Sequence, residues 1–249
     1  MRIESYVINV NKERIFGVSF IPPKHKNIPL ILTHGSFDNH CQYPLPHLAR
    51  FLANKGYITF RFDFRGCGNS DGNEEEYCLS SQMEDLEKVI DFIKMKTNKN
   101  KVGIIAKSIS CIPSFIIASK RKDITMIIAL GPPLHIDKYW SEEEVEEVKK
   151  RGYIFHEGCK YGLKYALEMR NLKKNYIESL KKIDIPTLLI VGENDKKVSL
   201  EEVKTILSLL KSEGKKMEII KNADHSFKMN ENNLEDVKKC VENFLLELE

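Results

Sequence analysis

The sequence has no long apolar run: none of its stretches approaches the roughly 20 apolar residues that a membrane-spanning helix needs. It also has no apolar stretch behind Met1–Ser5, so no signal peptide is evident. Neither sign of charge dominates, because 39 Lys and Arg face 36 Asp and Glu, which leaves a net charge of +3 without a concentrated basic stripe. We therefore expect a soluble, cytoplasmic protein that does not bind nucleic acid and does not span a membrane.

Metal-binding and disulfide patterns are missing as well. The cysteines form no C-x-x-C pair, and no Cys/His spacing predicts a zinc site. They are better interpreted as scattered thiols in a reducing compartment, at Cys41, Cys67, Cys78, Cys111, Cys159 and Cys240. We expect no metal and no disulfide framework.

Strand-like and helical stretches alternate along the chain. A 42% hydrophobic content suffices for a sizeable core, and 249 residues suit a single α/β domain over 1–249. Residues 2–10 and 14–21 predict a hairpin, and the apolar runs predict strands at 29–33, 57–62, 102–106, 124–130, 186–191 and 217–220. Helices are predicted at 46–55, from Ser81 and from Ser199 with capping boxes, and at 234–248. Because the strands are apolar on both faces, the pattern predicts a mostly parallel sheet with helices on both sides.

Residues 134–182 interrupt this alternation. They contain no strand-like run and predict helices, beginning at Ser141. The segment is rich in aromatic residues, at Tyr139, Trp140, Tyr153, Phe155, Tyr161, Tyr165 and Tyr176. Because it follows a strand, it emerges at the carboxyl ends of the strands, where ligands bind in such sheets. We predict a small helical cap there; the alternative is a helical excursion whose aromatic residues pack only among themselves.

A serine stands where the strand 102–106 turns into an apolar helix. A strand that feeds directly into a helix, with a serine at the corner, is the geometry of a nucleophile elbow. The usual G-x-S-x-G pattern here reads Ala106-Lys107-Ser108-Ile109-Ser110, with small residues in place of both glycines. By itself this stretch fits an ordinary strand–helix unit equally well.

Three chemically complementary side chains follow three different strands: Ser108, Asp195 and His225. A serine hydroxyl is a poor nucleophile at neutral pH and needs an imidazole to take its proton, while a carboxylate fixes the imidazole tautomer. Their order in the chain is the one typical of the α/β-hydrolase triad. Glu193 and Asp224 are rival acids, although Asp224 is adjacent to His225, which makes the geometry awkward.

In these features the chain resembles the α/β-hydrolase family, specifically its esterase/lipase-like and serine-aminopeptidase-like members. The resemblance covers nearly the whole length and rests on five motifs, namely His34-Gly35, Asp63-x-Arg65-Gly66-x-Gly68-x-Ser70, the elbow, Gly192-x-x-Asp195-x-x-Val198 and Ala223-Asp224-His225. It implies an eight-stranded, mostly parallel sheet whose first hairpin supplies the antiparallel part.

The resemblance also implies an oxyanion hole built from two backbone N–H groups. One belongs to Ile109, and the other to Ser36, with Phe37 as second choice. Phe37, Lys107 and Trp140 are candidate substrate contacts. Lys107 either influences His225 or an anionic substrate, or points out of the pocket and does neither.

Three further residues have structural interpretations. Asp63 and Arg65 are expected to form a structural pair in their loop and not to take part in catalysis. His34 is expected to bond the backbone of the oxyanion loop.

The sequence therefore predicts a serine hydrolase that cleaves carboxylic esters through an acyl-enzyme, without a cofactor. Its partner would be a small-molecule ester with an apolar acyl or aryl group, and a homodimer is possible. The same site would also suit thioesters, or peptides at a free amino terminus. The latter need an acidic cluster in the cap, for which the candidates are Glu142, Glu143, Glu144, Glu146, Glu147 and Glu157. A non-catalytic ligand-binding module is the alternative outside the enzymes.

Overall fold

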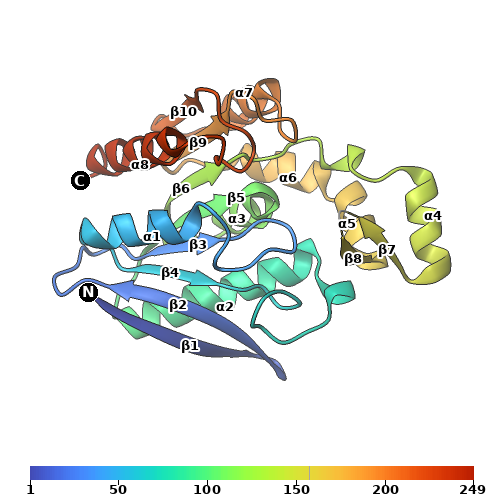
Figure 1. Cartoon of the computed structure of the whole chain (residues 1–249), viewed down its shortest axis with the longest axis horizontal. Coiled ribbons are helices and arrows are strands. Elements are labelled where there is room, and N and C mark those ends of the chain that lie inside the picture. Colours follow the sequence, from blue (N-terminus) through green and yellow to red (C-terminus); the bar gives the residue numbers. More distant parts are fainter. Residues whose placement is uncertain (157) are drawn as a thin grey trace.

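An eight-stranded sheet runs through the molecule (Figure 1). The computed structural model describes residues 1–156 and 158–249. The strands lie in the order β1 (Arg2–Val10), β2 (Glu13–Ile21), β4 (Thr59–Phe62), β3 (Leu30–Thr33), β5 (Val102–Lys107), β6 (Ile124–Leu130), β9 (Thr187–Gly192) and β10 (Lys215–Ile220). The first hairpin is antiparallel and β2 meets β4 antiparallel, whereas the remaining pairs are parallel. The predicted fold class is confirmed.

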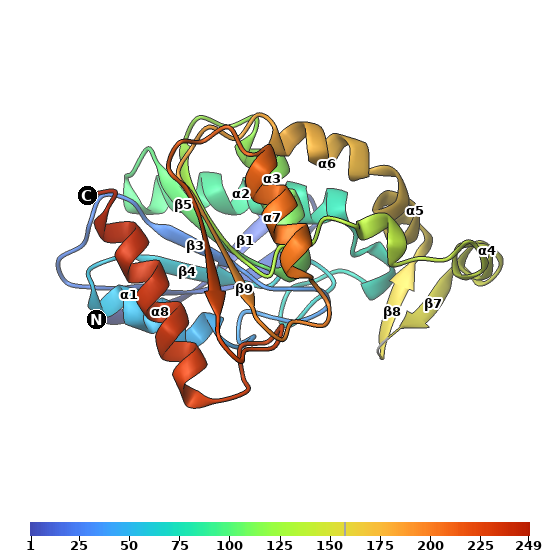
Figure 2. The same cartoon turned by 90° about the horizontal axis from the view of Figure 1, so that it is seen from above.

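Helices cover both faces of this sheet (Figure 2). One face packs against α1 (Leu45–Asn54) and α8 (Glu231–Leu246). The other face packs against α2 (Leu79–Thr97), α3 (Cys111–Ala118), α6 (Lys173–Leu180) and α7 (Leu200–Leu209). Along β5 successive side chains serve opposite cores: Ile104 and Ala106 join the second, and Ile105 joins the first. Burial on both faces explains why the central strands are apolar throughout.

The two predicted capping boxes have different outcomes. Ser199 accepts a hydrogen bond from the Glu202 N–H at 3.2 Å, and the predicted start of α7 is confirmed. The predicted start of α2 at Ser81 is wrong, because the helix already begins at Leu79. There Ser81 is the third helical residue, and its hydroxyl accepts from the Cys78 N–H at 3.0 Å.

The segment 134–182 is not purely helical, which corrects the sequence analysis. It contains η3 (Ile136–Lys138), α4 (Glu142–Arg151), the antiparallel hairpin β7 (Tyr153–His156) and β8 (Cys159–Gly162), α5 (Leu163–Asn171) and α6. Each hairpin strand has four residues, too few to show a period of two, although aromatic and β-branched residues favour strands. Figure 1 shows the hairpin and α4 beyond one end of the eight-stranded sheet.

Two further findings concern the described residues only. None of the six cysteines forms a disulfide bond within residues 1–156 and 158–249. No helix among these residues is both long and apolar enough to cross a membrane.

Candidate active site

The elbow forms as a sharp turn between β5 and the short 3₁₀ helix η2 (Ser108–Ser110), which continues into α3. Ser108 has φ +55°, a left-handed conformation that is costly for a residue with a Cβ. Ser110 stabilises this turn, because its buried hydroxyl lies 2.8 Å from Thr33 Oγ1 and 2.9 Å from the Lys107 carbonyl oxygen. The serine in the place of the second glycine is therefore part of the turn.

The structure brings the three predicted triad residues together. Asp195 Oδ2 lies 2.7 Å from His225 Nδ1, and His225 Nε2 lies 2.9 Å from Ser108 Oγ. With Nδ1–H donated to the carboxylate, Nε2 is left to accept the serine proton. The other carboxylate oxygen of Asp195 accepts from the N–H groups of Lys197 and Val198, at 2.8 and 2.9 Å, which fixes its orientation.

Neither rival acid reaches the imidazole. Glu193 accepts a hydrogen bond from the Asn222 N–H at 2.9 Å. Asp224 is occupied by its own loop and accepts from the Ser226 and Lys228 N–H groups, each at 3.1 Å. The geometry therefore favours Asp195 as the partner of the histidine.

One neighbour of the histidine was missed by the sequence analysis. Gly131 follows β6 with φ +61°, and a Cβ there would lie 3.0 Å from His225 Cε1. A side chain at this position would push the imidazole away from Ser108. A glycine directly after a predicted strand and before Pro132 was the sequence feature that could have indicated this close approach.

The two expected oxyanion donors flank the serine. Ile109 is the second residue of η2 and directly follows Ser108. Ser36 follows β3 in a loop that lies close to the serine, because a Cβ on Gly35 would lie 3.3 Å from Ser108 Cβ. Among the described residues, neither Ile109 nor Ser36 donates its N–H to a backbone carbonyl in a turn or loop. The next residue, Phe37, also has a positive φ, of +47°.

His34 holds the oxyanion loop as expected. Its Nε2 accepts from the Phe64 N–H at 3.1 Å, so Nδ1 carries the proton and donates to the Gly35 carbonyl at 2.8 Å. Burial lowers the pKa of His34, which keeps the ring neutral. The predicted backbone bond is present.

A cavity of about 320 Å³ opens beside Ser108. Its walls come from the oxyanion loop, the elbow, the 134–182 segment with the residue before it, and the loops after β9 and β10. The lining residues are Ser36, Ser108, Ile109, Pro133, Tyr139, Trp140, His156, Tyr161, Tyr165, Met169, Lys196, Lys197 and His225. Trp140 lines it as predicted, whereas Phe37 and Lys107 are not among the lining residues. Sequence reasoning missed the contributions of β8 and α5, because they depend on how the hairpin folds back.

Lys107 points out of the pocket, which is the second of the two orientations considered from the sequence. It does not line the cavity, yet it does not reach solvent either, because only 3% of its surface is exposed. It shares a face of β5 with Ile105, toward α1 and α8. Burial lowers the pKa of Lys107 to about 8, against the attraction of Asp38.

Asp63 and Arg65 have structural partners, but they do not pair with each other as expected. Asp63 Oδ1 lies 2.8 Å from His40 Nδ1, and Oδ2 accepts from the Asn69 N–H at 2.8 Å. The first bond ties the loop after β4 to the loop after β3, and the second lies within the loop after β4.

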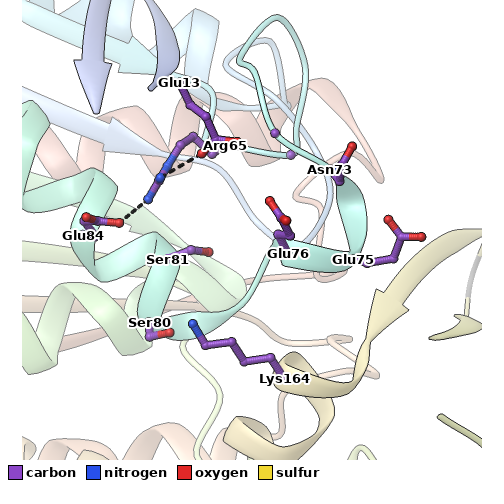
Figure 3. Close-up of a pocket in the computed structure, with 11 residues that line it drawn as sticks. Glu13, Arg65, Asn73, Glu75, Glu76, Ser80, Ser81, Glu84 and Lys164 are labelled. Atoms are coloured by element: carbon purple, nitrogen blue, oxygen red, sulfur yellow. Dashed lines mark hydrogen bonds and ion pairs between the residues drawn. The ribbon is translucent and has the colours of Figure 1, made fainter. Parts of the chain in front are cut away.

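Arg65 borders a second, larger cavity of about 600 Å³ (Figure 3). Its guanidinium donates to Asp85 at 2.6 Å and to Glu13 at 2.9 Å, and it also bonds Glu84. Figure 3 shows Arg65 reaching between Glu13 and Glu84, with Lys164 of α5 on the opposite side. No serine–histidine pair lines this cavity, so the candidate chemistry lies in the smaller one. Among the described residues, no group of three or more His, Cys, Asp and Glu side chains is arranged to hold a metal ion.

Comparison with known proteins gives consistent results. A family model described as acyl transferase matches residues 2–242. An acyl transferase from Photobacterium leiognathi is 26% identical over 239 residues, which cover 88% of this chain and 74% of that protein. Among solved structures, Est1E from Butyrivibrio proteoclasticus with bound ferulic acid superposes with a TM-score of 0.84 at 20% identity, over 97% of this chain and 98% of that one. Mouse α/β hydrolase domain-containing protein 10 superposes with a TM-score of 0.81 at 15% identity, over 99% and 100%. These two likenesses show an α/β-hydrolase fold.

Proposed function

The chain belongs to the acyl transferase family, and from that premise we propose that it cleaves acyl esters through a covalent acyl-enzyme on Ser108. The observation that carries the proposal is the continuous chain of hydrogen bonds from Asp195 through His225 to Ser108, at 2.7 and 2.9 Å. That chain ends at a cavity, where a substrate carbonyl can reach the serine.

The geometry supports a two-step reaction. Ser108 Oγ attacks the carbonyl carbon while His225 Nε2 takes its proton, and Asp195 stabilises the imidazolium. The tetrahedral oxygen, which carries the negative charge, accepts hydrogen bonds from the N–H groups of Ile109 and Ser36. Collapse breaks the bond to the leaving alcohol, which receives the proton from His225. Water, or an acceptor alcohol, then attacks the acyl carbonyl carbon while His225 takes its proton. The bond to Ser108 Oγ breaks, the serine receives the proton back from His225, and the acid or the new ester is released.

The cavity supports a carboxylic ester of small to moderate size with an apolar acyl or aryl group. Its volume of about 320 Å³ is at the lower end of small-molecule sites. The 134–182 segment, acting as a cap over the strand ends, contributes the rings of Trp140, Tyr161 and Tyr165 to its walls.

A thioester is the second candidate substrate, because family membership favours acyl transfer and the triad attacks either carbonyl. A peptidase acting at a free amino terminus has less support. None of the described α4 glutamates lines the cavity, and they bond elsewhere, as Glu142 with Arg170, Glu146 with Lys149 and Glu147 with Arg151. Glu157, the remaining candidate for binding an amine, lies outside the described residues.

A substrate panel tests the proposal. Nitrophenyl esters of acetate to octanoate, a matched acyl thioester and an aminoacyl anilide are assayed with and without an acceptor alcohol, with Ser108→Ala as the blank. We expect turnover of the ester and the thioester, with an acyl adduct on the protein in intact-mass spectra. Preference for the anilide would replace the proposal by a peptidase. Absence of turnover and of any adduct would favour the ligand-binding module.

A further inference from the structure

The side chain of Ser36 is held by the 134–182 segment and not by its own loop. Its hydroxyl lies 3.2 Å from Tyr161 OH on β8 and 3.5 Å from Tyr165 OH on α5. Both tyrosines are nearly buried, at 6% and 3% exposure, so their hydroxyls have few alternative positions. These bonds join residues 125 and 129 positions apart in the chain.

Phe37, the residue after Ser36, is held by the ring of Tyr161 and by a second aromatic ring. Phe37 packs at a ring-centroid distance of 4.5 Å against Tyr161 and 4.4 Å against Tyr77. Its φ of +47° is unfavourable for a residue with a Cβ and needs support from the surrounding packing. The Ser36 N–H belongs to the peptide that joins Gly35 to Ser36, and both Ser36 and the residue after it are held by side chains from outside the loop.

The hairpin itself is firmly seated on the body of the protein. A Cβ on Gly162 would lie 2.1 Å from the Glu75 carbonyl oxygen of η1 (Glu74–Glu76), so β8 contacts that turn backbone to backbone. Lys160 forms an ion pair with the Glu75 side chain. Tyr161 lies between these two anchors, with its position along β8 fixed on both sides.

We propose that Tyr161 and Tyr165 are positioning residues for the oxyanion hole: their hydroxyls hold Ser36 so that its backbone N–H faces the carbonyl attacked by Ser108. The inference rests on the proposed function and deepens it, because it makes one oxyanion donor depend on the segment that covers the site. Tyr161 and Tyr165 act through Ser36 and take no part in proton transfer.

The test compares Tyr161→Phe and Tyr165→Phe with Tyr153→Phe. Tyr153 lies on the same hairpin and packs against Phe155, but it does not contact Ser36. Phenylalanine keeps the ring packing and removes only the hydroxyl. With nitrophenyl acetate, too small to fill the cavity, we expect kcat/KM to fall about 5- to 10-fold in Tyr161→Phe and less in Tyr165→Phe. Tyr153→Phe should match the wild type.

Two readouts separate positioning from a structural role. Affinity for a trifluoromethyl ketone, which forms a tetrahedral adduct, should fall in parallel with kcat/KM, while KM stays unchanged. In a double-mutant cycle, Tyr161→Phe should lose most of its effect in a Ser36→Ala background, because the bond it removes is already absent.

The outcomes also distinguish failure of this inference from failure of the proposed function on which it rests. If the wild type turns over the ester and both phenylalanine variants match it, the positioning role is wrong and the proposed function stands. Additive effects of Tyr161→Phe and Ser36→Ala would equally overturn the inference, because the two side chains would then act independently. If the wild type neither turns over the ester nor binds the ketone, both proposals fail.

Discussion

Asp195 and Asp224 show how far a single residue's role can be inferred from its place in the sequence. Both are carboxylates near His225 in the predicted fold, and the sequence favoured Asp195 because it follows a strand of its own, whereas Asp224 is adjacent to the histidine. The structure supplies the physical reason: Asp195 Oδ2 reaches Nδ1 at 2.7 Å, while Asp224 accepts bonds from its own loop. That Ser108, Asp195 and His225 lie together could be predicted because each follows a strand, and the ends of parallel strands meet at one edge.

The two acids can be distinguished by matched substitutions. Asp195→Asn should lower kcat on an ester by about 10⁴-fold, because an amide donates toward Nδ1 and favours the wrong imidazole tautomer. Asp224→Asn keeps an oxygen acceptor for the Ser226 and Lys228 N–H groups, and its kcat should stay within about threefold of the wild type. Steady-state kinetics on both variants checks this; a larger loss in Asp224→Asn than in Asp195→Asn would reverse the assignment.

The burial of Lys107 is the feature of the site region that could least be predicted from the sequence. A lysine that precedes a serine at a turn is usually exposed, and its burial depends on α1 and α8, which pack over the same face of β5. Its lowered pKa means that the folded protein binds this proton less readily than the unfolded chain does. Between about pH 8 and 10.5 the unfolded state therefore holds more protons, and the contribution of Lys107 to stability rises with pH.

Lys107→Met should accordingly stabilise the protein at neutral pH. We expect a gain in the free energy of unfolding of up to about 3 kcal/mol at pH 7, which shrinks toward zero as the pH rises from 8 to 10.5. Urea unfolding at several pH values measures the difference from the wild type, and the exposed Lys120→Met serves as the control. A difference that stays constant with pH would show that the buried charge is not its cause.

At the scale of elements, the alternation of strands and helices predicted every strand of the large sheet, with boundaries shifted by one or two residues. The sequence pattern could do this because the inner strands are buried on both faces and are mostly apolar. The edge strands β1 and β10 are partly exposed. The hairpin of β7 and β8 could not be found in this way. It is partly exposed, its strands are short, and it is held in place by tertiary contacts with η1.

Gly162 tests whether these contacts hold the hairpin. With φ −84° its backbone suits any residue, so an added methyl group acts only through the clash with the Glu75 carbonyl oxygen. Gly162→Ala should lower the hydrogen-exchange protection of residues 153–156 and 159–162 and reduce kcat/KM, because Tyr161 moves with β8. Gly214→Ala is the control, since a Cβ there would meet only ordinary contacts at 3.6 Å or more. Equal protection in both variants would contradict the account.

For the whole molecule, motif order and fold class could be predicted together, because five short motifs in the right strand-and-loop context require one topology. The residues that line the cavity could not be predicted as completely. The walls of the cavity combine residues from five separate parts of the chain, and those from β8 and α5 depend on a hairpin that the periodicity does not reveal. The substrate contacts were therefore the weakest part of the sequence-based interpretation.

The central claim is that this assembled fold activates Ser108 as a nucleophile. The most direct measurement is covalent labelling by a fluorophosphonate probe of the wild type, of Ser108→Ala and of Ser208→Ala, a control at an exposed serine of α7. The account predicts labelling of the wild type and of Ser208→Ala, with none in Ser108→Ala. Labelling of all three would place the nucleophile elsewhere, and labelling of none would mean that the hydrogen-bonded triad does not activate the serine.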